Sequence, residues 1–107
     1  MVEISKSDWK KYREKIADWQ ENYMERLLQE YIVFLNSDKP ASEKFWELEK
    51  MIKQDKKCHG VLIDMNKSSA IYDIAGLIKS DVIKLDDLHD FSEELQEAVR
   101  VIIDIKW

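Results

Sequence analysis

The sequence is poor in the residues that interrupt helices and shape tight turns. It has 2 glycines and 1 proline among 107 residues, too few for the many turns of a β-sandwich or a β-barrel. Its 1 cysteine cannot form an intramolecular disulfide. This agrees with a reducing compartment, and we expect a cytoplasmic protein.

Hydrophobic stretches are short as well. The longest uninterrupted apolar run covers residues 31–35, whereas a membrane-spanning helix needs about 20 predominantly apolar residues. Residues 1–5 have neither the basic flank nor the apolar core of a signal peptide, so we expect none. The sequence therefore predicts no contact with a membrane.

The residues that the chain does contain favour helices. Apolar residues make up 45% of the sequence and charged residues 36%, a balance typical of a globular domain whose helices each have one solvated face. The length suits one domain and not two. We predict a single all-α domain, residues 1–107, built as a bundle of four to five helices with one long N-terminal helix.

The long helix is expected over residues 7–36, which contain neither glycine nor proline. Ser5 or Ser7 can cap its start, and Pro40 restarts the chain in the next helix. Apolar and aromatic residues recur at helical steps of three or four along one face: Trp9, Tyr12, Ile16, Trp19, Tyr23, Leu27, Tyr31 and Phe34.

Shorter helices are expected after it. The spacing predicts a helix over residues 40–57, ended by a left-handed Gly60, then a short helix, a break over residues 66–69 and a helix to about residue 80. An extended stretch is expected at residues 81–85, followed by a single helical turn at residues 86–89. The predicted buried stripe of the 40–57 helix consists of Ala41, Phe45, Leu48 and Ile52.

A final helix is expected over residues 93–106, with Ser92 as its cap. Leu95, Val99 and Ile102 would form its buried side. Residues 99–105 are rich in β-branched side chains, so a strand at the extreme C-terminus stays open as an alternative.

The first helix is too long for a compact domain of this size. A helix of about 29 residues is roughly 43 Å long, whereas a compact domain of this length is roughly 34 Å across. The helix should therefore overhang, kink or be covered by another chain. As part of the stripe, Trp9 and Tyr12 are expected in the core. Because Trp and Tyr are enriched in interfaces, the sharper interpretation makes them contact residues: the N-terminal end of the helix would dock on a partner or on a second copy.

Negative charge is concentrated near the C-terminus. The formal charge is −5, yet residues 1–80 are balanced, and residues 81–97 have seven acidic side chains against Lys84 alone. Such a cluster suits a basic partner; the alternative is that its members stabilise helix starts. Direct nucleic-acid binding is disfavoured, because phosphate contacts need a basic stripe. The predicted contact residues are Asp86, Asp87, Asp90, Glu93, Glu94 and Glu97.

Motifs for catalysis are not found. The soft ligand types are Cys58, His59 and His89, and their spacing is a poor match to structural zinc sites. Glycine-rich phosphate loops, nucleophile elbows and calcium-binding loops are absent. We therefore expect no enzyme, no cofactor and no metal, with a small zinc-binding protein as an alternative.

Residues 45–50 and 55–57, and again 83–88 and 91–95, resemble a family of small uncharacterised helical proteins of Gram-positive gut and oral bacteria and their mobile elements. Some members carry a "multidrug transporter" label, which the lack of a membrane segment contradicts here. The resemblance implies a helical fold and assigns no functional residue. Proteins of such elements are similar in size, charge and setting to anti-CRISPR proteins and other inhibitors of host defence.

These observations favour a non-enzymatic protein-binding module. The specific expectation is an acidic inhibitor, anti-CRISPR-like in character, that occupies the phosphate-binding surface of a basic nucleic-acid-handling protein. The alternative from another class is a self-associating structural or adaptor protein, a homodimer that pairs through the first helix.

Overall fold

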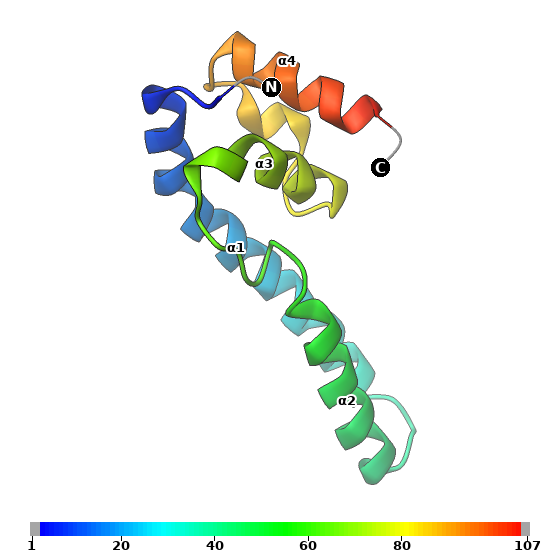
Figure 1. Cartoon of the computed structure of the whole chain (residues 1–107). Coiled ribbons are helices and arrows are strands. Elements are labelled where there is room, and N and C mark those ends of the chain that lie inside the picture. Colours follow the sequence, from blue (N-terminus) through cyan, green and yellow to red (C-terminus); the bar gives the residue numbers. More distant parts are fainter. Residues whose placement is uncertain (1–2, 106–107) are drawn as a thin grey trace.

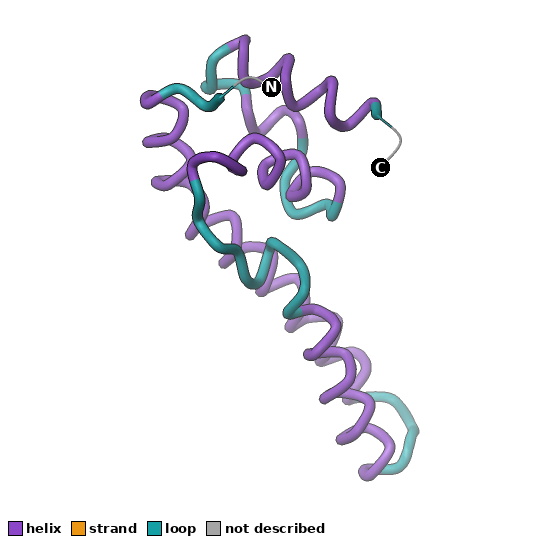
Figure 2. The backbone as a smooth tube through the Cα atoms, in the orientation of Figure 1, coloured by secondary structure: helices purple, strands orange, loops and turns teal. Residues whose placement is uncertain are grey.

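The computed structural model describes residues 3–105, which contain helices and no strand (Figures 1 and 2). The all-α prediction is confirmed, and for these residues the alternative of a C-terminal strand is wrong, because Leu95, Val99 and Ile102 are buried along one side of a helix. The end of that helix predicted at residue 106 lies outside the described residues. In chain order the elements are α1 (Lys6–Leu35), α2 (Ala41–Asp55), η1 (Lys67–Ser69), α3 (Ala70–Lys79), η2 (Leu85–Leu88) and α4 (Glu93–Asp104).

The molecule consists of a head and an arm. The head contains the N-terminal half of α1 with α3, η2 and α4, and the arm contains the C-terminal half of α1 with α2 antiparallel to it (Figure 1). Its principal extents are 51 × 29 × 22 Å and its radius of gyration is 16.4 Å, compared with about 13 Å for a compact domain of this length. The predicted overhang of the first helix is confirmed, but it occurs at the C-terminal end of α1.

The start of α1 is joined to the start of α4. Ser5 caps α1 by accepting a hydrogen bond from the Asp8 backbone N–H at 3.1 Å. The Asp8 carboxylate, only 3% exposed, accepts one from the Ser92 backbone N–H at 3.0 Å and one from the Ser92 hydroxyl. Ser92 in turn caps α4 through Leu95 N–H at 3.2 Å, as predicted. Two helix N-termini therefore share one buried anion, which their dipoles favour.

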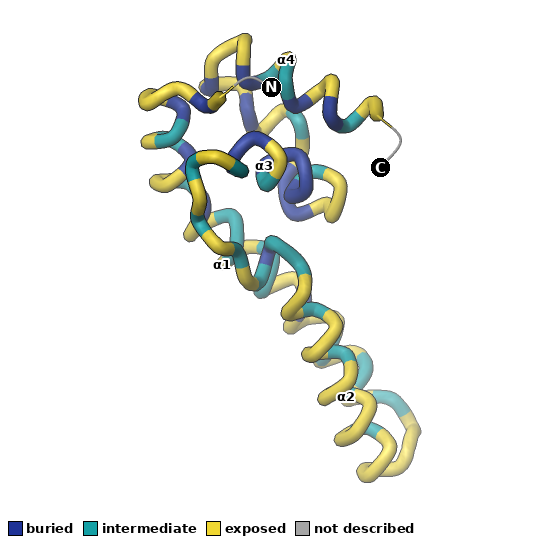
Figure 3. Tube along the Cα trace, in the orientation of Figure 1, coloured by how far each residue is buried: buried dark blue, intermediate teal, exposed yellow. Residues whose placement is uncertain are grey.

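The apolar core lies in the head, where the buried part of the tube is concentrated (Figure 3). The α1 stripe contributes Tyr12 and Ile16, and Trp9 and Trp19 pack against it half-buried. Trp19 stacks on Phe91 with ring centroids 6.2 Å apart, which joins α1 to the turn before α4. The completely buried large side chains are Tyr12, Ile74, Leu77, Leu88, Leu95 and Val99.

Tyr12 places a hydroxyl in this core without a hydrogen-bond partner among the described residues. Burial, and next the negative charge of Asp73, raise the pKa of Tyr12, so the hydroxyl stays protonated. An unsatisfied buried hydroxyl costs stability. We therefore expect Tyr12→Phe to raise the free energy of unfolding by about 1 kcal/mol, measured by urea denaturation. A loss of stability of that size would contradict the placement of this hydroxyl.

The arm is a pair of helices with little burial. Tyr31 donates a hydrogen bond to the Asp55 carboxylate, and the Lys44 ammonium donates one to the Leu35 carbonyl at 2.7 Å. No residue of α2 is fully buried, so the predicted buried stripe is wrong: Phe45 and Ile52 are exposed. A single neighbouring helix can cover only one side of α2, and among residues 3–105 only α1 lies alongside it (Figure 3).

The segment between α2 and η1 runs along the middle of α1 as a loop (Figure 2). Gln20 donates a hydrogen bond to the His59 carbonyl at 3.0 Å, and the short helix predicted after Gly60 is not formed. Asn66 marks the predicted break by capping η1 through Ser68 N–H. The left-handed Gly60 is also wrong: Gly60 does not have a positive φ, and it is buried with its Cα against the Tyr23 ring.

The segment from Asp81 to η2 turns sharply and is not extended. Asp81 has a φ of 59°, and the next residue, Val82, donates its N–H to the Leu77 carbonyl at 2.9 Å. This hydrogen bond closes the end of α3 in the way that left-handed helix caps do. The helical turn predicted at residues 86–89 is confirmed as η2, which begins one residue earlier.

Candidate functional site

The six predicted contact carboxylates divide into two groups. All six belong to exposed residues, but Asp86, Asp87 and Asp90 surround η2, whereas Glu93, Glu94 and Glu97 lie on α4. The six carboxylates therefore belong to two elements and have different hydrogen-bonding surroundings.

The η2 group is largely used within the molecule. Asp87 accepts the Lys84 backbone N–H at 2.8 Å, which stabilises the start of η2, and Asp86 lies in the same first turn. Asp90 pairs with the Lys15 ammonium at 3.1 Å, and this interaction holds the pKa of the Asp90 carboxyl below its usual value. Asp87 therefore stabilises a helix start, as the alternative predicted. Asp90 instead joins the η2 segment to α1.

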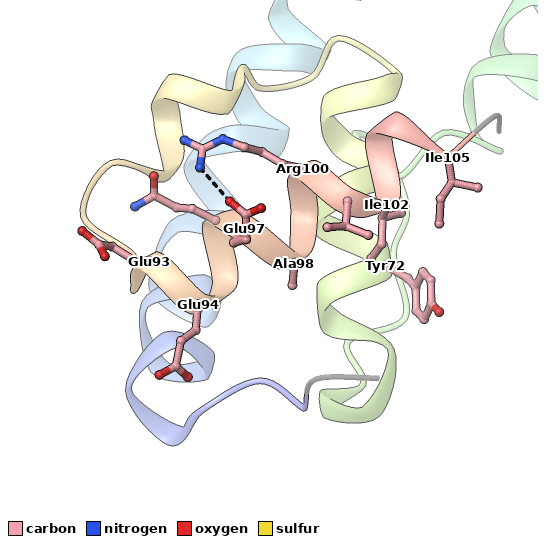
Figure 4. Close-up of a pocket in the computed structure, with 10 residues that line it drawn as sticks. Tyr72, Glu93, Glu94, Glu97, Ala98, Arg100, Ile102 and Ile105 are labelled. Carbon is pink, nitrogen blue, oxygen red and sulfur yellow. Dashed lines mark hydrogen bonds and ion pairs between the residues drawn. The ribbon is translucent and has the colours of Figure 1, made fainter.

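The α4 group borders a groove of about 1100 Å³ on the outer side of α4. Figure 4 shows Glu93 and Glu94 at one end, pointing away from the helix, and Tyr72 of α3 with Ile105 at the other end. Between these ends the lining is mixed: the apolar Ala98, Val101 and Ile102 lie among polar and charged side chains. The groove is lined by Tyr72, Glu93, Glu94, Gln96, Glu97, Ala98, Arg100, Val101, Ile102 and Ile105.

The two ends of the groove differ in chemistry. Glu93 and Glu94 occupy the first turn of α4, at the positive end of its helix dipole. Glu97 is partly neutralised by Arg100, whose guanidinium is 3.4 Å from its carboxylate. At the other end, the exposed fractions are 47% for Tyr72, 51% for Val101 and 62% for Ile105. Such a surface fits a ligand with positive charge at one end and apolar side chains at the other.

The sequence interpretation missed the apolar half of this groove. The signal was present as a second stripe on the last helix, one position before the buried stripe. Its members, at helical spacing, are Glu94, Ala98, Val101 and Ile105. Tyr72 could not be found in this way, because only the packing of α3 against α4 brings it there.

The aromatic residues predicted to contact a partner are not available for that role at the N-terminal end of α1. Tyr12 is 0% exposed, so its assignment as a contact residue is wrong. Trp9 is half-buried against the core, and the Arg13 guanidinium lies over its ring at 5.6 Å. The physical reason is that the η2 segment and α4 fold over this end of α1 and leave the opposite end with α2 alone beside it (Figure 1).

The residues considered for zinc are used in other ways. His59 lies beside Asp73, with its Nε2 3.7 Å from the carboxylate, and the Cys58 sulfur accepts the Gly60 backbone N–H at 3.4 Å. His89 contacts the Asp86 carbonyl through Nδ1 at 3.0 Å. Among residues 3–105, no group of three or more His, Cys, Asp or Glu is placed to hold a metal ion. The zinc alternative has no support in this geometry.

Within the described part of the chain, none of the helices has the length and apolar character required to cross a membrane. No protein-family model, no curated protein and no solved structure matches this chain. Family membership therefore supplies no site and no activity.

Proposed function

We propose that this protein is a non-enzymatic binding module whose groove along α4 takes a basic amphipathic segment of a partner protein. The observation that carries the proposal is the juxtaposition of exposed carboxylates and exposed apolar side chains on one helix (Figure 4). Apolar contact gives such a complex its affinity, and the carboxylates give it orientation and a fast association rate.

The specific form of the proposal is an inhibitor of a basic nucleic-acid-handling protein, anti-CRISPR-like in character. A surface that binds phosphate carries arginine and lysine side chains. Glu93, Glu94 and Glu97 would pair with such side chains and compete with nucleic acid for them. The apolar end of the groove explains how the protein could prefer one basic partner over any cation, because bare charge gives little specificity.

A peptide titration tests the groove. The probe is a labelled helical peptide with leucines in its first turns and arginines in its last turns, and binding is followed by fluorescence anisotropy. We expect the triple variant Glu93→Lys, Glu94→Lys and Glu97→Lys to weaken binding by at least tenfold, because it reverses the charge at one end. We expect Val101→Ser with Ile105→Ser to weaken it by a similar factor.

The matched control is a triple reversal at the tip of the arm, Asp38→Lys, Glu43→Lys and Glu47→Lys, which makes the same change in net charge at exposed positions. This control should bind as the wild type does. Equal losses in both triple variants would reduce the effect to net charge and contradict the groove.

Affinity capture tests the inhibitor form. We expect the wild-type protein to retain basic nucleic-acid-binding proteins from a bacterial lysate, the groove triple variant to lose them, and added duplex DNA to displace them. Inhibition at a phosphate-binding surface would be contradicted if the wild type and the groove triple variant retained the same proteins. It would also be contradicted if added DNA displaced none of them.

A further inference from the structure

The arm exposes large apolar side chains that its two helices cannot cover. Leu28 of α1 is 56% exposed and Phe45 of α2 is 65% exposed. Single exposed apolar residues are ordinary, but a group of them marks a contact site. The arm face is defined here by five exposed residues: Leu28, Ile32, Leu35, Phe45 and Ile52.

Helical geometry places all five residues on the same side of the arm. Tyr31 and Asp55 face each other, since they are hydrogen-bonded. At about 100° per residue, the apolar side chains of α1 are rotated roughly 40° to 100° from Tyr31, and those of α2 roughly 60° to 80° from Asp55, in the same sense. Because the two helices are antiparallel, rotations of the same sense turn both sets of side chains toward one side of the pair.

The arm face is large enough for a dimer. A large side chain presents about 200 Å² when fully exposed, so the measured exposures correspond to roughly 500 Å² for the five residues and roughly 1000 Å² for two copies. That total reaches the lower size limit of specific protein–protein interfaces. Two helices from each chain would then bury their apolar faces as the helices of a four-helix bundle do.

One charged pair beside the arm face complements a second copy. By the same rotation, Glu25 borders the α1 side at about 120° from Tyr31. The α2 side is bordered by Lys56 at about 100° and by Glu49 at about 120° from Asp55, and all three residues are exposed. A two-fold dimer whose arm tips point the same way sets α1 of each chain against α2 of the other, so Glu25 of one chain lies toward Lys56 of the other. The opposite orientation sets α1 against α1 and places like charges together, which is unfavourable.

We propose that a second copy of this chain covers the arm face, with α1 of each copy packed against α2 of the other in a four-helix bundle. The inference goes beyond the proposed function, because it uses a different surface and leaves the groove along α4 free. In such a dimer two grooves act together, and their effective concentration strengthens binding to a partner with two basic segments.

Sedimentation equilibrium across the micromolar range tests the dimer. The wild type is expected to dimerise, and Leu28→Glu and Phe45→Glu are each expected to weaken the dimer at least tenfold, because a buried unpaired carboxylate opposes association. The matched control is Val33→Glu. Val33 is 73% exposed on the same helix but points about 160° away from Tyr31, so this variant should dimerise as the wild type does.

A charge exchange tests the orientation. Glu25→Lys alone and Lys56→Glu alone should each weaken the dimer several-fold, whereas the double variant should restore it, because the exchanged pair forms between the two chains. A wild type that stays monomeric, or equal effects of Leu28→Glu and Val33→Glu, would overturn the inference, and a double variant as weak as the single ones would overturn the arrangement. Peptide binding to the groove by monomeric Leu28→Glu distinguishes failure of the dimer from failure of the proposed function.

Discussion

Replacing Asp8 by alanine is expected to lower the free energy of unfolding by about 3 kcal/mol. The Asp8 carboxylate is buried and accepts hydrogen bonds from the backbone N–H and the hydroxyl of Ser92. Its removal leaves the Ser92 N–H without this acceptor, removes a buried carboxylate from two helix N-termini, and opens a gap between α1 and α4. Urea denaturation followed by circular dichroism at 222 nm measures the loss, on the order of a third of a typical domain's stability.

Two variants make this prediction specific. Asp8→Asn keeps one acceptor oxygen and removes the charge, so its loss should be smaller than that of Asp8→Ala. Asp18→Ala removes an exposed carboxylate from the same helix and should change stability by less than about 0.5 kcal/mol. If Asp8→Ala were as mild as Asp18→Ala, the junction between α1 and α4 would not have the role assigned to it.

Adding one methyl group at Gly60 should destabilise the protein by about 2 to 3 kcal/mol. A Cβ at this position would lie 2.3 Å from Cδ2 and 2.8 Å from Cγ of the Tyr23 ring. The clash involves the base of the ring, which cannot rotate away as the end of a flexible chain would. The Arg26 guanidinium lies over the same ring, 5.1 Å from the Tyr23 centroid. Thermal unfolding of Gly60→Ala measures the cost as a lower Tm.

A double-mutant cycle identifies the cause of that cost. In a Tyr23→Ala background the ring is gone, so Gly60→Ala should cost little, and the two effects should not add. Additive losses would instead point to the backbone at Gly60. The ring also gives a spectroscopic signal: burial, and next its interaction with Cys58, raise the pKa of Tyr23 to about 12. Loss of packing in Gly60→Ala should move that titration toward the ordinary tyrosine range.

For Asp8 and Gly60, the sequence alone does not reveal the contact that each residue makes with a distant part of the chain. The place of Asp8 in the first helical turn can be predicted from the sequence, because the cap residue Ser5 lies only three positions before it. Its bond to Ser92 joins positions 84 residues apart, which no local pattern reveals. Gly60 was identified as special for the wrong reason: it was expected to supply a left-handed conformation, whereas its lack of a side chain admits the ring of Tyr23.

The candidate groove and the arm face were partly predictable as well. The surplus of acidic residues after position 80 was visible in the sequence, but only the packing of α4 separates Glu93, Glu94 and Glu97 from the carboxylates around η2. The overhang of a long first helix followed from its length. Which end overhangs did not, because that depends on where the later helices pack.

The sequence by itself determined the four α-helices, the N-terminal caps Ser5 and Ser92, and the spacing of the apolar side chains, because hydrogen bonding and side-chain spacing within a helix are local properties. The tertiary structure decided which stripes are covered. The apolar side chains of α4 are buried in the core that α1 and α3 also form. Those of α2 pack against a single helix and stay partly exposed. Burial depends on contacts between residues distant along the chain. The exposed groove and the exposed arm, on which both proposals rest, are therefore features of the folded molecule.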